Sequence, residues 1–117
     1  MSKTQLYSRD ANGVTFANPS DPDFTVRFKN TQSRKSLGGL TTQNYVEEIV
    51  FNDLNPITIN GVSANDSVSV RLRISGSAES KARVTAILNS LAAQLPTWAS
   101  NSVPLGFEPV EPPDVVG

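Results

Sequence analysis

The sequence of 117 residues contains no cysteine and no histidine. Without cysteine there is no disulfide, no thiolate metal site and no cysteine nucleophile. The lack of histidine removes the commonest general base and the commonest metal ligand. We therefore predict a protein that is not an enzyme, with no catalytic residues, no metal, no cofactor and no small-molecule substrate.

Long hydrophobic runs are also missing. No apolar stretch approaches the roughly 20 residues that a membrane helix needs, and no apolar signal segment follows residues 1–5. We expect a soluble, unexported protein with no membrane partner. Hydrophobic residues make up 38% of the chain and its net charge is −1, which indicates a globular protein with little core, so a partner subunit could supply the missing burial.

The first third of the sequence predicts a β-hairpin and a half-buried strand. Residues 5–17 flank Asn12-Gly13, which favours a tight turn because both residues tolerate positive φ. Prolines and aspartates interrupt pairing over residues 18–23. Residues 24–29 then alternate, with aromatic and aliphatic side chains on one face. The other face carries Thr25, Arg27 and Lys29.

The middle of the chain alternates less regularly. Residues 42–51 predict a second strand, but each face carries aliphatic residues and one glutamate, so the pattern leaves the inward face open. We expect loops over residues 30–41 and 53–66, because the first is polar and the second contains Pro56 and Asn60-Gly61. Residues 57–59 could form a short strand within the second loop.

The last third predicts a clear strand and then helices. Residues 67–75 alternate, with Ser67, Ser69, Arg71 and Arg73 on the polar face. Ser77 fits a helix N-cap, with Glu79 in the first turn. An amphipathic helix is predicted over residues 78–95, with Pro96 ending it. Its apolar stripe is Val84, Ile87, Leu88, Leu91 and Leu95.

Strands first and helices last predict an α+β fold, with helices on one side of an antiparallel sheet. A short second helix over residues 97–102 would carry Trp98 as a packing anchor. We expect a single domain over residues 1–117. Its parts are the hairpin 1–17, the sheet 24–75, the helices 77–102 and an extended, Pro-rich acidic tail 103–117.

The candidate functional surface consists of two basic strand faces. If the helix covers the apolar side of the sheet, the basic residues share the uncovered side. Lysine and arginine release counterions from a phosphate backbone, and hydroxyl groups fix its position. An ordinary solvated sheet face gives the same pattern, and composition alone favours that interpretation. The candidate residues for binding a nucleic-acid backbone are Arg27, Lys29, Arg71, Arg73, Thr25 and Ser69.

Two further features have weaker functional interpretations. Glu47 and Glu48 are adjacent, so in a strand they point to opposite faces and cannot act as a carboxylate pair. We expect one in solvent and one at a subunit contact. Tyr45 could stack on a base, although a core or interface role is the better prediction.

The order of elements resembles the coat proteins of the single-stranded RNA bacteriophages, the leviviruses. Residues 74–79 (Ile-Ser-Gly-Ser-Ala-Glu) resemble the strand-to-helix junction of the coat in the Acinetobacter-phage branch. Residues 105–107 (Leu-Gly-Phe) resemble the segment after that coat's helices. The resemblance in plan covers nearly the whole chain, and the poorly patterned strand at 42–51 departs from it.

The resemblance implies a homodimer in which two sheets join edge to edge and each subunit's helices reach across its partner. The helical stripe Val84, Ile87, Leu88, Leu91 and Leu95 would then form the dimer interface. Such dimers assemble in the bacterial cytoplasm into the icosahedral, quasi-equivalent capsid of the virion. The sheet faces the single-stranded genomic RNA, and residues 53–66 match the loop at the symmetry axes. Family dimers often also bind an RNA hairpin at the replicase start and repress translation.

The runner-up hypothesis is a free-standing sheet-and-helix RNA-binding regulator that remains a dimer or monomer. Particle size distinguishes the two, because a capsid protein elutes as a megadalton-scale particle and a regulator does not.

Overall fold

The computed structural model describes residues 5–10, 13–99 and 104–107. It contains one five-stranded sheet with the order β1-β2-β3-β4-β5. The strands are Gln5–Asp10, Gly13–Asn18, Asp21–Leu37, Leu40–Ile59 and Val62–Ser77. They are followed by the 3₁₀ turn η1, Ala78–Ser80, and the helix α1, Lys81–Ala99. The chain divides into two compact units, residues 1–75 and 76–117.

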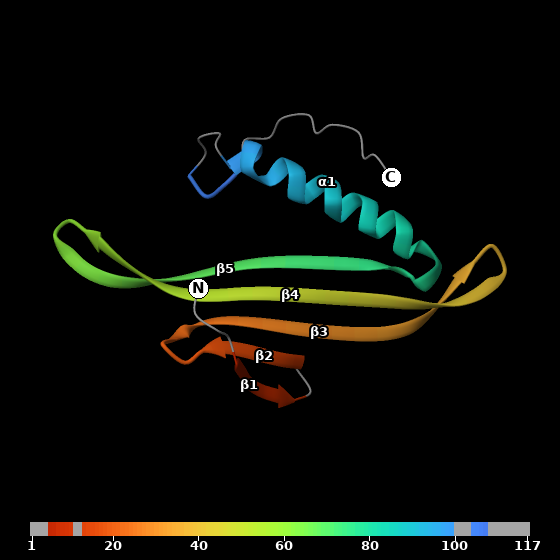
Figure 1. Cartoon of the computed structure of the whole chain (residues 1–117), viewed down its shortest axis with the longest axis horizontal. Helices are drawn as coiled ribbons and strands as arrows, with labels where there is room; N and C mark the ends of the chain where they lie inside the picture. Colours follow the sequence, from red (N-terminus) through yellow and green to blue (C-terminus); the bar gives the residue numbers. More distant parts are fainter. Residues whose placement is uncertain (1–4, 11–12, 100–103, 108–117) are drawn as a thin grey trace. The chain divides into compact units, whose positions relative to one another are not determined.

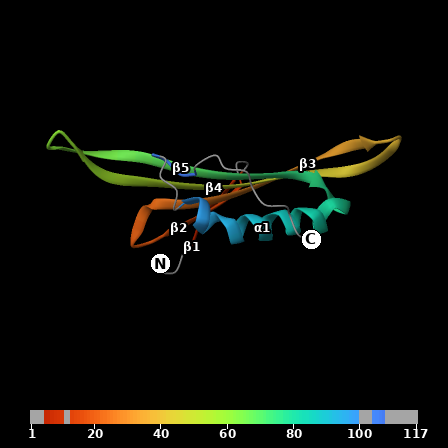
Figure 2. The ribbon, with the colours of Figure 1, turned by 90° about the horizontal axis from the view of Figure 1, so that it is seen from above.

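The sheet is an antiparallel meander of hairpins, as the predicted α+β fold requires. β1 pairs with β2, β2 with β3, and β3 with β4, each antiparallel. The two long hairpins, β3–β4 and β4–β5, turn at opposite ends of the sheet (Figures 1 and 2). Both turns have two central residues with positive φ, at Gly38-Gly39 and at Asn60-Gly61. This is the geometry of a type I′ turn, whose twist matches that of the flanking strands.

The prediction of loops over residues 30–41 and 53–66 is wrong, because both segments are the ends of β-hairpins. Residues 30–41 continue β3 to Leu37 and begin β4 at Leu40, and these two leucines pair across the turn. Residues 53–66 hold the end of β4, the turn at Asn60-Gly61 and the start of β5. Nearly all side chains of the two tips are exposed, so neither segment has an apolar face and the hydrophobic pattern that marks a strand is absent.

The interruption predicted over residues 18–23 is limited to a turn at Pro19 and Ser20. Asn18 pairs with Asp21, and the register shifts between Ala17 and Asn18. The Ser20 amide donates a hydrogen bond of 2.9 Å to Asn18 Oδ1. The side-chain amide oxygen therefore stabilises the turn, and the chain reverses within two residues.

The pairing of β3 with β4 determines which side of β4 joins which side of the sheet. Val26 is opposite Phe51 and Phe28 is opposite Ile49. Because directly paired residues project to the same side, β4 contributes Phe51, Ile49 and Tyr45 to the side that carries Phe28. We call this side the apolar face. It also holds the ring contacts Phe16–Phe28 and Phe24–Phe51, at centroid distances of 5.9 and 6.5 Å.

The chain by itself buries few hydrophobic side chains. Among the described residues only Ala17, Val50 and Ala86 form a buried hydrophobic core, and no large side chain is fully buried. On the apolar face, Phe28 and Phe51 remain 44% and 40% exposed. Small domains depend on burial for stability, and these side chains contribute little of it in the single chain.

In the described residues of the second unit, 76–99 and 104–107, one α-helix covers residues 81–99, where a helix ending before Pro96 and the start of a second helix were predicted. Ser77 is the N-cap of η1, but its side chain makes no cap hydrogen bond and lies 3.3 Å from the Ser80 hydroxyl. Pro96 lies inside α1, which continues to Ala99, so the prediction that it ends the helix is wrong. Pro96 leaves the carbonyl of Ala92 without its helical donor, but Ala92 is exposed and water can supply one.

The predicted apolar stripe of α1 is only partly buried. Ile87 and Leu95 are exposed, and Val84, Leu88 and Leu91 are half-buried. Trp98 makes an edge-on ring contact with Phe107 at 5.9 Å, which agrees with a packing role. Residues 100–103 and 108–117, which include parts of the predicted second helix and tail, lie outside the described residues. No helix in the described part of the chain is long and apolar enough to span a membrane.

Candidate nucleic-acid interface

Two basic residues of β3, Arg27 and Lys29, and two of β5, Arg71 and Arg73, lie on the side of the sheet opposite the apolar face. Arg27 pairs with Val50 and Lys29 pairs with Glu48, so both project with the even-numbered residues of β4. Arg71 of β5 reaches the same side, because its Nη1 lies 3.6 Å from Glu48 Oε2. Arg73, two residues further along β5, follows by strand alternation. We call Arg27, Lys29, Arg71 and Arg73 the cation face.

The hydroxyl residues predicted to accompany these cations share their side of the sheet. Thr25 is two residues from Arg27 and pairs with Asn52. Ser69 is two residues from Arg71 and is exposed. The structure therefore brings the six predicted residues to one side of the sheet, across the neighbouring strands β3, β4 and β5.

Arg27 differs from the other cations in its surroundings. It is half-buried, and its neighbours in register are Thr15 on β2 and the buried Val50 on β4. Its Nε is buried and has no hydrogen-bond partner among the described residues. A buried donor without a partner is uncommon in folded proteins, so Arg27 retains hydrogen-bonding capacity that the sheet itself does not use.

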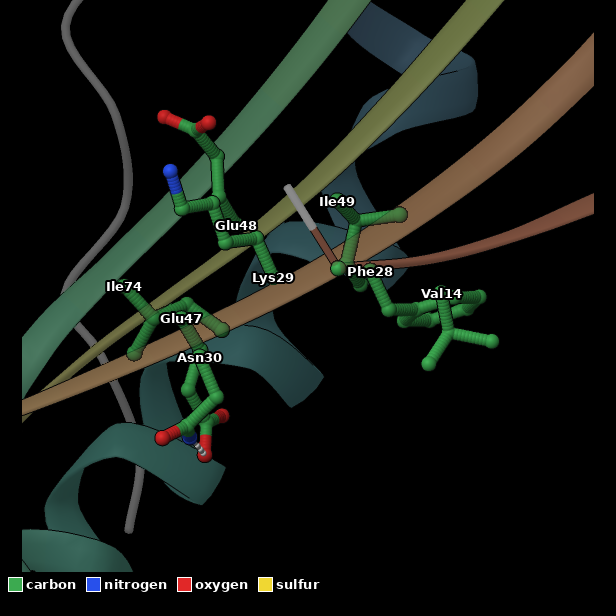
Figure 3. A pocket seen from close by; sticks show the side chains of 9 residues that line it. Val14, Phe28, Lys29, Asn30, Glu47, Glu48, Ile49 and Ile74 are labelled. Atoms are coloured by element: carbon green, nitrogen blue, oxygen red, sulfur yellow. Dashed lines mark hydrogen bonds between the residues drawn. The ribbon is translucent and has the colours of Figure 1, made fainter. Parts of the chain in front are cut away.

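Glu48 is the residue of this surface that sequence reasoning missed. It lies directly opposite Lys29 and within ion-pair distance of Arg71. Its side chain is 19% exposed, against 57% for Arg71. Figure 3 shows Lys29 and Glu48 extending together from β3 and β4 to one side of the sheet. Four cations and one carboxylate leave this surface a formal charge of 4 − 1 = +3.

Glu47 belongs to the apolar face, as the alternation of the strand requires. Its Oε1 accepts a hydrogen bond of 3.1 Å from Asn30 Nδ2, and Figure 3 shows this pair on the side away from Lys29 and Glu48. Side-chain amides continue this row towards the β3–β4 turn, where Gln43 donates to Gln32 at 3.4 Å and Gln32 to Asn30 at 3.5 Å. A polar ladder therefore replaces the apolar face along the hairpin.

Tyr45 is opposite Gln32, on the same side as this ladder. It therefore points away from the cation face, and base stacking beside those cations is not open to it. The remaining prediction for Tyr45 is a role in the core or at an interface.

A cavity of about 490 Å³ lies where β2, β3, β4 and β5 meet (Figure 3). Its apolar lining comes from Val14, Phe28, Ile49 and Ile74. Within the described ranges, no three histidine, cysteine, aspartate or glutamate residues gather where they could hold a metal ion. An apolar wall of this kind suits the packing of another side chain better than a charged ligand.

Comparisons with known proteins show the fold. No protein-family model matches the chain, and no curated protein matches it. Among solved structures, the virus-like particle of bacteriophage PQ-465 matches with 24% sequence identity and a TM-score of 0.73, over 97% of this chain and 98% of that one. The virus-like particle of bacteriophage ESE001 matches with 19% identity and a TM-score of 0.52, over 91% and 98%. The chain thus has the fold of subunits found in bacteriophage virus-like particles, and the predicted coat-protein fold is confirmed.

Proposed function

We propose that this chain is the coat protein of a single-stranded RNA bacteriophage, which forms homodimers and assembles around RNA. The observation that carries the proposal is the small buried core of the single chain, in a fold shared with subunits of virus-like particles. A subunit that leaves its apolar surfaces open needs other copies of itself to cover them.

Two apolar surfaces support the dimer. One is the apolar face of the sheet, where Phe28 and Phe51 are about two-fifths exposed. The other is the stripe of α1, which includes the exposed Ile87 and Leu95. Each would be covered by a second copy if the helix of one subunit packed on its partner, which is the arrangement that the family resemblance implies.

The β4–β5 hairpin tip supports assembly beyond the dimer. Ile59 and Val62 flank the Asn60-Gly61 turn and are 58% and 67% exposed. Exposure of aliphatic side chains to water is unfavourable in free energy, and their burial is favourable. In the coat proteins that this chain resembles, the corresponding tip meets neighbouring subunits at the symmetry axes of the shell. Contact with other tips would therefore bury both Ile59 and Val62.

The cation face supports contact with RNA. Its +3 charge and the adjacent hydroxyl groups of Thr25 and Ser69 suit phosphate oxygens. Binding of an RNA hairpin with repression of the replicase would use the same face. The surface recognises the phosphodiester backbone through charge, so its affinity should depend strongly on salt.

The direct test of assembly is to express the full chain in bacteria and examine it by size-exclusion chromatography and electron microscopy. We expect closed, megadalton-scale particles that contain RNA. A soluble dimer or monomer that binds RNA without forming particles would contradict the capsid function and would support the free-standing regulator.

The test of the RNA face is the double variant Arg71→Ser/Arg73→Ser. Particles or dimers should still form, but packaged RNA should decrease, and the log–log salt slope of RNA binding should fall by about 0.7 for each cation removed. The matched control is Lys81→Ser/Arg83→Ser, which removes two exposed cations of α1. Equal loss of RNA in both variants would show that total charge alone matters, and normal packaging by the first variant would exclude the face.

A further inference from the structure

We infer that Glu48 is an internal competitor of RNA phosphates on the cation face, and that it limits the affinity of the coat protein for RNA. The inference rests on the proposed function and deepens it. Glu48 supplies to this surface a carboxylate that lies between two of the cations that would hold RNA, opposite Lys29 and 3.6 Å from Arg71.

The geometry explains why Glu48 acts on its neighbours. A carboxylate between two cations neutralises part of their charge before any ligand arrives. Its side chain is mostly buried, so its field is less screened than that of a freely solvated group. Arg71 is more than half exposed, so a phosphate can approach its guanidinium from solvent.

RNA binding therefore exchanges one anion for another at Arg71. A phosphate that contacts Arg71 either displaces Glu48 from the ion pair or shares the guanidinium with it. In both cases the phosphate and the carboxylate repel each other at a separation of a few ångströms. At a separation of about 7 Å and an effective dielectric constant between about 40 and 80, this repulsion weakens binding by about three- to eightfold.

A moderate, reversible affinity suits a surface that must hold RNA of many sequences. Strong contacts with the first RNA segment bound would fix it in place, whereas a competing carboxylate allows the segment to be released and repositioned. Glu48 would act through Arg71 and Lys29, which makes it a positioning residue rather than an RNA ligand.

The test compares Glu48→Gln with Glu47→Gln in the full chain. Both substitutions remove one negative charge from adjacent positions of β4, but Glu47 lies on the opposite face, hydrogen-bonded to Asn30. Binding of fluorescein-labelled oligouridine to the unassembled protein is measured by fluorescence anisotropy, between about 50 and 200 mM salt. Thermal melting of each variant verifies that it is folded.

We expect Glu48→Gln to bind oligouridine about three- to eightfold more tightly at low salt, with a salt slope steeper by up to about 0.7. Glu47→Gln should match the unmodified chain. When Arg71 is also replaced by serine, the gain from Glu48→Gln should shrink, because the carboxylate then has one fewer cation to occupy. A purely structural role for Glu48 would not produce this coupling.

Two outcomes would overturn the inference. The first is unchanged or weaker binding by Glu48→Gln, and the second is equal tightening by Glu47→Gln. In either case, if Arg71→Ser/Arg73→Ser still weakens binding, the proposed RNA function stands without the competitor. If the arginine variant also leaves binding unchanged, the RNA function of this face is overturned as well.

Discussion

Replacing Gly13 with alanine should destabilise the sheet more than the same change at any other glycine compared below. Gly13 begins β2 with φ at +112°, a conformation that L-residues rarely adopt. A Cβ at this position would lie 2.1 Å from the carbonyl oxygen of Phe28, well inside van der Waals contact. The new methyl group would therefore push the start of β2 away from β3.

The magnitude follows from three contributions. Backbone strain at a positive φ costs about 1–3 kcal/mol. Separation of the strands weakens a ladder hydrogen bond, at about 1 kcal/mol, and loosens the Phe16–Phe28 ring contact, at about 0.5–1.5 kcal/mol. The sum is about 2.5–5.5 kcal/mol, a large share of the roughly 5–15 kcal/mol that stabilises a typical domain.

Two other glycines provide matched controls. Gly39 has φ at +85° but open space where its Cβ would lie, so Gly39→Ala should cost about 1–3 kcal/mol from strain alone. Gly76 has no positive φ, and a Cβ at this position would lie 3.9 Å from the nearest side-chain atoms, without a clash. Gly76→Ala should therefore be neutral or slightly stabilising.

Thermal unfolding of the three variants at equal protein concentration, followed by circular dichroism, should rank them in this order. The Gly13 variant should melt about 10 °C or more below the unmodified chain. A Gly13 variant that melts together with the Gly39 variant would refute the steric argument, because the contact with Phe28 would then have no measurable effect.

Two further predictions concern assembly. Leu91→Asp should prevent dimerisation, because a charge without a partner in an apolar contact costs several kcal/mol. Sedimentation of this variant should show monomer or unfolded chain. The control Ala92→Asp changes an exposed neighbouring residue and should leave the dimer intact. Ile59→Ser/Val62→Ser should leave the dimer intact but alter or abolish the shell in electron micrographs. The control Thr58→Ser should leave both the dimer and the shell unchanged. Unchanged particles from the double variant would contradict a role for the β4–β5 tip in contacts between dimers.

Local sequence signals were sufficient for the order of elements and for the strongest strands. The alternation of Phe24, Val26 and Phe28 with Arg27 and Lys29 correctly predicted a two-sided strand, because the period of a strand is fixed by its backbone. The same reasoning put Arg71 and Arg73 on one side of β5. Asn60-Gly61 was recognised as a turn signal and residues 57–59 as a candidate short strand, but the continuation of β4 up to that segment and the start of β5 after the turn were missed.

The missed strands share a physical cause. Residues 30–41 and 53–66 form the ends of two-stranded ribbons whose two faces both meet solvent, so no apolar period marks them. Their backbone hydrogen bonds, the turn geometry at Gly38-Gly39 and the amide ladder through Gln32 stabilise them instead. None of these interactions produces a hydrophobic pattern in the sequence.

By itself the sequence determined that the chain is α+β, that its cations alternate along two strands, and that its supply of core is small. Only the tertiary structure decided which side of β4 faces the cations. That choice depends on the register with β3, which joins residues far apart in the chain such as Lys29 and Glu48. A change of register by one residue would move Glu48 to the apolar face, so the charge of the candidate RNA surface is a property of strand pairing and not of any local segment.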